Sequence, residues 1–456
     1  MLILLFEKIE SKGLAHYSYL IGDENEAVVI DPKRNVDQYI QLANQNGMNI
    51  KYILETHRNE DYVIGTKELA KKTNAEIWHA DTNLDYNYGN SVKENQYFKV
   101  GRLKIEALNT PGHTMNSFSY LLYDFSNEPY MIFTGDLLFA GDTGRIDLLG
   151  EDMLDKMAKK MYNSLFNKVL PLGDGVIVCP AHGAGSVCGD TIADRDLTTI
   201  GLEKKVNPDL QYKSKDEFVK YKKEILEKPP YFRQMEKMNL KENTYLSELK
   251  NLKKFSPKEL KSLMNKNNTL ILDTRNELNF GAAHIPGSIS IWKDGLASFA
   301  GWFLNYEQDI VLISNQYPKE ELKILHWLGF DNVIGYLNGG LLKWHMAGYK
   351  SESIGMVKVQ KLCKILDKDN DVNILDIRSK SELNEDGQIK NSIHIHLTQL
   401  KQNLKKLSKD KPLYVFCGSG LRSTVAASLL KRADFENINV VLGGLEGWSS
   451  TTCPII

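Results

Sequence analysis

The sequence predicts an α/β protein in three folded parts, and three observations support this. The chain has 456 residues, which is enough for about three domains of ordinary size. Residues 1–206 contain a series of short apolar runs, with helical stretches between them, and each run ends in Asp, His or Gly. Residues 250–456 contain an internal repeat, which indicates two copies of one small α/β domain.

The composition is that of a globular protein, with 42% hydrophobic residues, 25% charged residues and a net charge of -1. This balance gives no reason to expect nucleic acid or an anionic membrane as a partner. No apolar run reaches the roughly 18 residues of a membrane helix, and the opening MLILLFEKIE lacks the basic flank of a signal peptide and predicts a first strand. We therefore expect a cytoplasmic protein. Its five cysteines are odd in number and scattered, which favours free thiols over a disulfide framework.

The first part is expected to contain buried strands whose ends carry polar residues into a shared cleft. The runs are EAVVIDP (26–32), KYILETH (51–57), LKIEALNTPGH (103–113), SYLLYD (119–124), YMIFTGD (130–136) and VIVCPAHG (176–183). The segment VDQYIQLANQNG (36–47) predicts a helix between two of them.

A connector and two repeated domains follow. Residues 207–249 are dense in Lys, Glu and Pro and predict a mainly helical connector. In the repeat, 270–291 matches 373–395, 309–316 matches 412–419, and 335–344 matches 440–448. The three matches have nearly the same spacing along the chain, so they predict domains at 250–352 and 353–456, each with strands that lead through a loop into a helix.

Polar residues at the strand ends of residues 1–206 predict a metal site. They are His57 and Asp61 in ETHRNEDY, His113 in TPGHT, Asp136 in TGD and His182 in PAHG. A single histidine in an apolar context is usually a core residue with satisfied hydrogen bonds, but four such motifs in series point to metal ligands. The set resembles the metallo-β-lactamase superfamily over about the first 200 residues, and this resemblance implies an αββα sandwich.

The loop that begins at His57 departs from the superfamily pattern His-x-His-x-Asp-His, because Asn59 replaces the second histidine and Tyr62 the last. The thiolester hydrolases of the glyoxalase II type bind two metals and need these histidines. The persulfide dioxygenase branch uses two imidazoles and one carboxylate, a set that suits mononuclear Fe(II) with open positions. The resemblance therefore implies one Fe(II) per chain, bound by His57, His113 and Asp136.

Two further segments of this part resemble the same branch. In GDTGRIDLLG, Arg145 corresponds to an arginine that contacts an anionic thiol substrate, and Asp147 would orient it through a charge-assisted pair. In HGAGSVCG, Cys188 corresponds to a cysteine of the rhodanese-fused variants that lies near the iron and could carry a persulfide. A small buried hydrophobic residue is the other interpretation of Cys188, and Cys179 is expected in the core.

The sharpest motif is YVFCGSGLRSTVAASLLKRADF (414–435), in which a strand ends at Cys417 and a helix follows the loop. Backbone N–H groups, the helix N-terminus and Arg422 would stabilise a thiolate or a persulfide anion. With LDIR, GQIKNSIHI and GGLEGW around it, residues 353–456 resemble the rhodanese sulfurtransferases. Classical tyrosine phosphatases, the main competitor, have one more residue between Cys and Arg. The loop residues expected to bind the sulfur substrate are Gly418, Ser419, Gly420 and Leu421.

The middle copy keeps LDTR, AAHIPGSI and NGGLLKW but has Asn315 where the thiol should stand. Asparagine cannot carry a persulfide, so this copy predicts an inactive rhodanese. The order of the three parts resembles the persulfide dioxygenase–rhodanese fusions that detoxify sulfide. The resemblance implies that O2 and a low-molecular-weight persulfide give sulfite, which leaves as thiosulfate with the sulfur of Cys417. Superfamily members often form homo-oligomers, so a second copy is a possible partner.

Two alternatives stay open at this point. One is a zinc-dependent thiolester hydrolase with rhodanese tails, which predicts bound zinc and hydrolysis of acyl thiols. The other is a sulfurtransferase whose front domain holds no metal, which predicts that only Cys417 matters for activity. Uptake of O2 in the presence of a persulfide distinguishes both from the dioxygenase.

Overall fold

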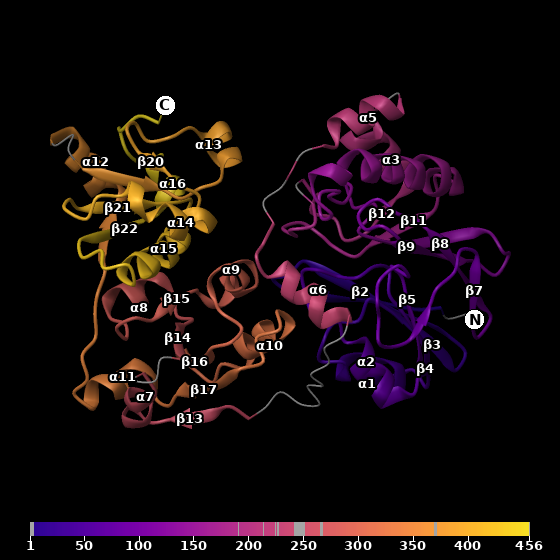
Figure 1. Ribbon diagram of the computed structural model, residues 1–456, viewed down its shortest axis with the longest axis horizontal. Helices are drawn as coiled ribbons and strands as arrows, with labels where there is room; N and C mark the ends of the chain where they lie inside the picture. The colour runs from indigo at the N-terminus through magenta and orange to yellow at the C-terminus, as the bar shows by residue number, and fades with distance from the viewer. Residues whose placement is uncertain are drawn as a thin grey trace. The chain divides into compact units, whose positions relative to one another are not determined.

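The computed structural model divides into two units, residues 1–250 with 326–329, and residues 251–325 with 330–456. It describes residues 4–189, 191–212, 214–223, 225, 228–240, 251–264, 268–368 and 372–455 (Figure 1). Within these ranges, no helix is long and apolar enough to cross a membrane.

The first unit contains two six-stranded sheets. The first sheet follows chain order: β1 (Leu5–Ser11), β2 (His16–Asp23), β3 (Glu26–Ile30), β4 (Asn49–Leu54), β5 (Glu76–His79) and β6 (Asn90–Ser91). The second runs β12 (Thr198–Thr199), β11 (Ile177–Pro180), β10 (Pro129–Gly135), β9 (Phe118–Tyr123), β8 (Leu103–Asn109) and β7 (Gln96–Val100). Strands β3, β4 and β5 pair in parallel, because the helices α1 (Asp37–Gln45) and α2 (Thr66–Thr73) form the crossovers between them.

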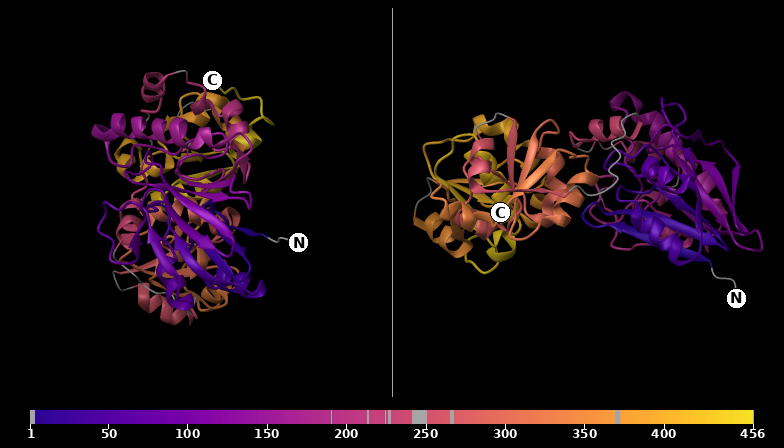
Figure 2. Two further views of the ribbon diagram at one scale, coloured as in Figure 1. Left: turned by 90° about the vertical axis from the view of Figure 1, so that its right-hand side faces the viewer. Right: turned by 90° about the horizontal axis from the view of Figure 1, so that it is seen from below.

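The two sheets pack face to face around one apolar core, to which Tyr19 and Phe98 belong. A second cluster, with Tyr39, lies between the first sheet and α1 and α2, and a third lies between the second sheet and α3 (Leu154–Ser164) and α5 (Lys215–Tyr221). Helices therefore cover both outer faces, as Figure 1 and the left view of Figure 2 show. The predicted αββα sandwich is confirmed.

Burial on both faces explains why the strands read as continuous apolar runs. In β3, Val28 and Ile30 lie in the core between the sheets, while Ala27 and Val29 lie under the helices. Side chains of a strand alternate between its two faces, so both sets must be apolar here. The first polar residues come where the strands end.

The remaining short elements of the first unit follow β10 in the chain. They are the 3-10 turns Glu151–Met153, Leu170–Leu172 and Pro208–Leu210, the π-helical turn Leu165–Val169, and the helices α4 (Ile200–Val206) and α6 (Phe232–Leu240). The described part of the predicted connector contains helices, as expected, and its residues 241–249 lie outside the described residues.

The second unit contains two parallel five-stranded sheets with the same strand order. The first runs β13 (Lys253–Phe255), β17 (Val333–Leu337), β16 (Asp309–Ile313), β14 (Thr269–Asp273) and β15 (Ile289–Ser290). The second runs β18 (Gly355–Lys358), β22 (Ile438–Leu442), β21 (Leu413–Phe416), β19 (Asn373–Asp376) and β20 (Ile393–His394). The identical order confirms that the sequence repeat is a repeated fold.

Both domains of this unit interleave strands with helices. The middle domain has α7 (Pro257–Met264), α8 (Glu277–Ala282), the 3-10 turn Lys293–Gly295, α9 (Leu296–Phe303), α10 (Lys319–Trp327) and α11 (Gly340–Met346). The C-terminal domain has α12 (Val359–Lys368), α13 (Lys380–Asp386), the 3-10 turns Leu397–Gln399 and Leu404–Lys406, α14 (Leu400–Asn403), α15 (Leu421–Lys431) and α16 (Gly444–Trp448).

The prediction that all five cysteines are free thiols is wrong. Cys363 on α12 and Cys453 form a disulfide, with Cα atoms 5.7 Å apart. The C-terminal segment reaches α12 because the Trp448 indole donates to the Cys453 carbonyl at 3.1 Å and Ile455 bridges to Ile389. The fold thus brings together two cysteines that are 90 residues apart in sequence. The other three cysteines are buried and free.

Candidate active sites

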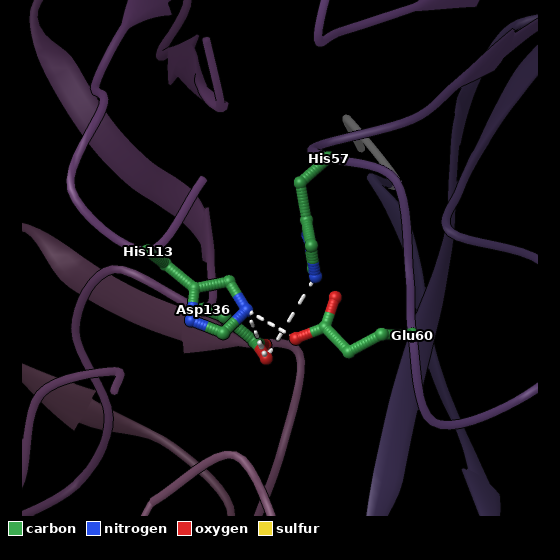
Figure 3. Close-up of side chains that lie close together, drawn as sticks. All are labelled: His57, Glu60, His113 and Asp136. Atoms are coloured by element: carbon green, nitrogen blue, oxygen red, sulfur yellow. Dashed lines mark ion pairs between the residues drawn. The ribbon is translucent and has the colours of Figure 1, made fainter. Parts of the chain in front are cut away.

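Four buried side chains converge at the strand ends of the first unit (Figure 3). His57 and Glu60 come from the loop after β4, His113 from the loop after β8, and Asp136 follows β10 directly. One possible ligand atom from each lies within 4.8 Å of those of the other three. The structure therefore brings together the three predicted metal ligands and adds Glu60, which the sequence analysis did not single out.

The potential ligand atoms of this cluster face one another. The His113 Nε2 atom lies 2.7 Å from Glu60 Oε1 and 3.5 Å from Asp136 Oδ2, and His57 Nε2 lies 3.7 Å from the same Asp136 oxygen. All these atoms are buried, and apart from the His113–Glu60 ion pair they have no hydrogen-bond partner, which costs about 1–3 kcal/mol for each group without a partner. A cation between them would satisfy all of them, so the donor set fits a divalent metal ion.

A hydrogen-bonded chain fixes the ring of His57. The Thr56 hydroxyl donates to Asp31 Oδ2 at 2.7 Å, and it has only one proton to give. Its oxygen must therefore accept from His57 Nδ1, at 2.9 Å. This leaves the Nε2 lone pair of His57 directed at the cluster, as partners outside the coordination sphere commonly do for metal-binding histidines.

The ring of His113 is fixed by a backbone carbonyl. Its Nδ1 lies 2.9 Å from the Arg145 carbonyl oxygen, which can only accept, so Nδ1 carries a proton and a metal would bind at Nε2. The chain can bring the Arg145 carbonyl this close to His113 only with glycine at position 144. A Cβ atom on residue 144 would lie 1.9 Å from the carbonyl oxygen of Asp136, which is too close. The Gly-Arg segment thus positions a ligand through its backbone.

The charges within the cluster determine its protonation. Burial alone would lower the pKa of His113, but Glu60 and Asp136 raise it to about 9. Without a metal, Nε2 therefore also holds a proton near neutral pH, and a metal ion would displace that proton. Burial alone would raise the pKa of Asp136 and of Glu60, but the neighbouring histidines hold both pKa values below their ordinary range. Both carboxylates are therefore ionised near neutral pH and available to a cation.

A second buried group, Asp61, His182 and Cys188, lies beside the first. The His182 Nδ1 atom lies 2.7 Å from Asp136 Oδ1, and its Nε2 lies 2.9 Å from Asp61 Oδ2. Burial raises the pKa of Cys188 well above its ordinary value, so this residue is a thiol in the metal-free chain. Cys179 lies in the core between the sheets, as expected.

The two residues that depart from the superfamily loop are both buried. The amide nitrogen of Asn59 donates to the His57 carbonyl at 3.3 Å. The ring of Tyr62 packs against His16, with ring centroids 4.0 Å apart. A phenol therefore stands where the superfamily loop has its last histidine.

Arg145 reaches Asp147 with two parallel hydrogen bonds, Nε to Oδ1 at 2.7 Å and Nη2 to Oδ2 at 2.8 Å. This is the predicted charge-assisted pair. A third nitrogen, Nη1, donates to the Val187 carbonyl at 3.2 Å. Arg145 also lines a cavity of about 170 Å³, whose lining residues do not include the four residues of the cluster. Substrate contact by Arg145 stays a prediction.

The thiol loop lies in the C-terminal domain. Cys417 is buried at the end of β21, and the Gly420 N–H donates to its Sγ at 3.1 Å. Helix α15 begins at the next residue, so its N-terminus lies beside the sulfur. On the other side, a Cβ on Gly444 would lie 2.2 Å from the Cys417 carbonyl oxygen, so α16 can approach the loop only through glycine.

Arg422 is held by a carboxylate from another part of the domain. Its Nη1 and Nη2 atoms donate to Glu382 Oε2 and Oε1 at 2.8 and 2.5 Å. Burial alone would raise the pKa of Glu382, but Arg422 and the α13 cap at Ser379 lower it to about 2. The pair is therefore ionised and fixes the guanidinium beside the thiol loop.

The middle domain has no thiol at the corresponding place. After β16 come Asn315, Gln316 and Tyr317, all exposed, and α10 then begins at Lys319. With the two helices aligned by their first residues, Glu320 takes the position of Arg422. An acidic side chain there would disfavour a thiolate or a persulfide anion.

The front part is a two-sheet sandwich with convergent histidines and carboxylates at its strand ends, which form a candidate metal site. The C-terminal part is a parallel α/β domain with a buried thiol loop. Residues 12–182 match the metallo-beta-lactamase superfamily, and residues 256–347 and 358–451 each match the rhodanese-like domain. A solved metallo-beta-lactamase from Staphylococcus aureus subsp. aureus COL is 32% identical, covers 74% of this chain and 98% of its own, and has a TM-score of 0.64. The chain therefore belongs to the metallo-β-lactamase superfamily, in a form extended by two rhodanese-like domains.

Relatives of the front part bear two different enzyme names. The persulfide dioxygenase ETHE1 of Homo sapiens is 30% identical over 213 residues, which are 45% of this chain and 74% of that protein. The hydroxyacylglutathione hydrolase GloC of Haemophilus influenzae is 28% identical over 218 residues, which are 43% of this chain and 93% of that protein. Overall similarity does not separate oxidation from hydrolysis, so the residues of the site must.

Proposed function

We propose that the chain is an Fe(II) persulfide dioxygenase joined to a rhodanese-type sulfurtransferase. In the first reaction RSSH, O2 and H2O give RSH and sulfurous acid, which ionises to sulfite. The observation that carries the proposal is the buried cluster of His57, His113 and Asp136, together with Tyr62 where a second metal would need a histidine. This favours one metal with open positions over the two-metal site of the hydrolases.

The residues of the first site have distinct tasks. His57, His113 and Asp136 would hold the ion, and bound Fe(II) would supply the binding and reduction of O2. The Asp31–Thr56 pair orients His57, and the Arg145 carbonyl orients His113. The guanidinium of Arg145, held by Asp147, is our candidate to bind an anionic group of the persulfide.

In the second site a persulfide RSSH transfers its outer sulfur to Cys417, which releases RSH and leaves a cysteine persulfide. Sulfite then attacks that outer sulfur, the S–S bond breaks, thiosulfate leaves and the Cys417 thiolate is restored. The Gly420 N–H, the start of α15 and Arg422 stabilise the anionic sulfur. Gly418, Ser419 and Leu421 complete the loop. Both sites share one chain, which raises the effective concentration of sulfite at Cys417.

The other elements of the proposal follow the sequence analysis. Cys188 is a candidate to hold a persulfide near the metal cluster. The domain limits are 1–206, 207–249, 250–352 and 353–456, and the middle copy is catalytically inactive. The compartment is the cytoplasm, where the Cys363–Cys453 disulfide is an uncommon feature.

A zinc thiolester hydrolase is the second candidate. The similarity to GloC favours it, and so does the group Asp61, His182 and Cys188, which offers three more donor atoms beside the first cluster. It predicts two bound zinc ions and hydrolysis of acyl thiols without O2.

Oxygen consumption tests the proposal. The full chain is reconstituted anaerobically with Fe(II) and given glutathione persulfide or coenzyme A persulfide. We expect rapid O2 uptake that depends on iron, is lost in His57→Ala, and is kept in Glu106→Gln, a control in strand β8. Equal uptake by the wild type and His57→Ala would contradict the proposal. Hydrolysis of an acyl thiol by the zinc-loaded chain, with no O2 uptake by the iron form, would support the hydrolase.

A further inference from the structure

We propose that Glu60 is a fourth protein ligand of the metal, so that the centre has two imidazoles and two carboxylates. This inference rests on the proposed metal centre and changes its composition. Glu60 stands at a variable position of the superfamily loop, between Asn59 and Asp61, where the loop pattern specifies no ligand.

The environment of Glu60 fits a metal ligand. Both carboxylate oxygens are buried, and in the described part of the chain the only ion pair of Glu60 is with His113, at 2.7 Å. This partner is itself a predicted ligand, and its Nε2 would give up its proton to bind a metal. Figure 3 shows the carboxylate directed at the point that His57, His113 and Asp136 also face. Once His113 binds a metal through Nε2, Glu60 loses its partner, and a buried carboxylate without a partner is costly. Coordination to the same divalent cation would remove that cost.

The loop backbone holds Glu60 in this orientation. The Arg58 N–H donates to Asp81 Oδ2 at 2.8 Å, and the Arg58 guanidinium binds Glu236 of α6. The Asn239 amide, also on α6, donates to the carbonyls of Asn59 at 2.6 Å and of Tyr62 at 2.8 Å. The loop is thus anchored on both sides of Glu60, and these contacts direct the Glu60 side chain toward the cluster.

A fourth protein ligand changes what the centre can accept. Three protein ligands leave three of the six positions that iron commonly offers, whereas four leave two. Two open positions would suffice for a persulfide sulfur and O2. For zinc, four protein ligands correspond to a closed tetrahedral site of the structural type. Glu60 therefore favours a six-coordinate metal, and the two carboxylates balance the charge of a divalent ion.

Metal titration of the full-length protein tests the role of Glu60. Wild type, Glu60→Gln, Glu60→Asp and the control Glu106→Gln are titrated anaerobically with Co(II) and with Fe(II), and the visible spectrum of the Co(II) form is recorded. We expect Glu60→Gln to bind both metals at least about 10-fold more weakly and to have an altered Co(II) spectrum. Glu60→Asp should also bind both metals weakly, because its side chain is shorter by one methylene group and its carboxylate lies farther from the ion. Glu106→Gln should match the wild type.

The possible outcomes separate this inference from the proposed function. Wild-type affinity and spectrum in Glu60→Gln, with metal binding lost in His57→Ala, would overturn the role of Glu60 and leave the metal centre standing. Full recovery in Glu60→Asp would mean that charge and not ligation matters, which also overturns it. No metal binding by the wild type would overturn both. If Glu60→Gln fails to fold, a crystal structure of the Co(II)-loaded wild type decides, with a Glu60 oxygen expected about 2.0–2.2 Å from the ion.

Discussion

The sheets of the middle and C-terminal domains have the same strand order. The two domains differ in the residues that follow the corresponding strands β16 and β21. Both keep a buried arginine on the aspartate two residues before it: Arg275 on Asp273 and Arg378 on Asp376. Both also keep a tryptophan whose indole donates to a backbone carbonyl a few residues later, Trp344 in one and Trp448 in the other. Since the copy without a thiol keeps these features, they serve the fold.

The features that differ belong to the chemistry. Where the C-terminal copy has Cys417 and Arg422, the middle copy has Asn315 and Glu320. Both the nucleophile and the sign of the nearby charge are changed. The comparison therefore predicts that Cys417 and Arg422 carry the proposed sulfur transfer, and substitutions in either copy can test this prediction.

The largest effect is expected for Cys417→Ser. A hydroxyl is a far weaker nucleophile and cannot hold a sulfane sulfur, so sulfur transfer should fall by at least about 10³-fold. Oxygen uptake should remain, and sulfite should accumulate in place of thiosulfate. Ion chromatography of both anions measures the result.

The matched control places a thiol in the middle copy, as Asn315→Cys in the Cys417→Ser background. We expect no recovery of thiosulfate, because Glu320 stands where the active copy has its arginine. Substantial recovery would mean that the thiol alone separates the two copies, and the comparison would fail.

A smaller effect is expected for Arg422→Gln. Loss of the guanidinium removes a positive charge beside the anionic sulfur and leaves Glu382 without its partner. Sulfur transfer should fall by roughly 10²-fold, measured as the rate of thiosulfate formation from a persulfide and sulfite. A rate equal to that of the wild type would contradict the assigned role. Arg378→Gln is unsuitable as a control because that residue is fully buried.

The smallest effect concerns the disulfide, which joins Cys363 and Cys453 only in the C-terminal copy. The double variant Cys363→Ser/Cys453→Ser should lose about 2–4 kcal/mol of stability, because a loop of this length restricts the unfolded chain. Sulfur transfer at 25 °C should stay near that of the wild type. Thermal unfolding measures the change, and reduced wild type should match the variant. Equal melting temperatures of the oxidised wild type and the double variant would refute the predicted stabilisation by the disulfide.

Much of the fold could be predicted from the sequence, because its signals are local or periodic. Buried strands are apolar runs with polar ends, so the sequence alone predicts that His57, His113 and Asp136 lie at one edge. The repeat predicted two copies of one domain through matched anchors. The loop around Cys417 is contiguous in sequence, so its thiol, glycines and arginine were all visible together.

The features that were missed depend on distant contacts. The direction of Glu60 is set by Asn239 and Asp81, which hold the loop from other parts of the unit. An acidic residue next to the substituted Asn59 was the available signal. The Cys363–Cys453 disulfide was missed because spacing does not reveal which cysteines the fold brings together.

Gly144 has a consequence for how the chain would respond to random mutagenesis. It carries no functional group, yet any added carbon there would collide with the Asp136 carbonyl and displace the carbonyl that orients His113. A saturation screen for activity would therefore score position 144 as intolerant, on a par with the ligands themselves. In such a screen, the intolerant positions would include those where the main chain passes closest to the metal cluster, in addition to those with reactive side chains.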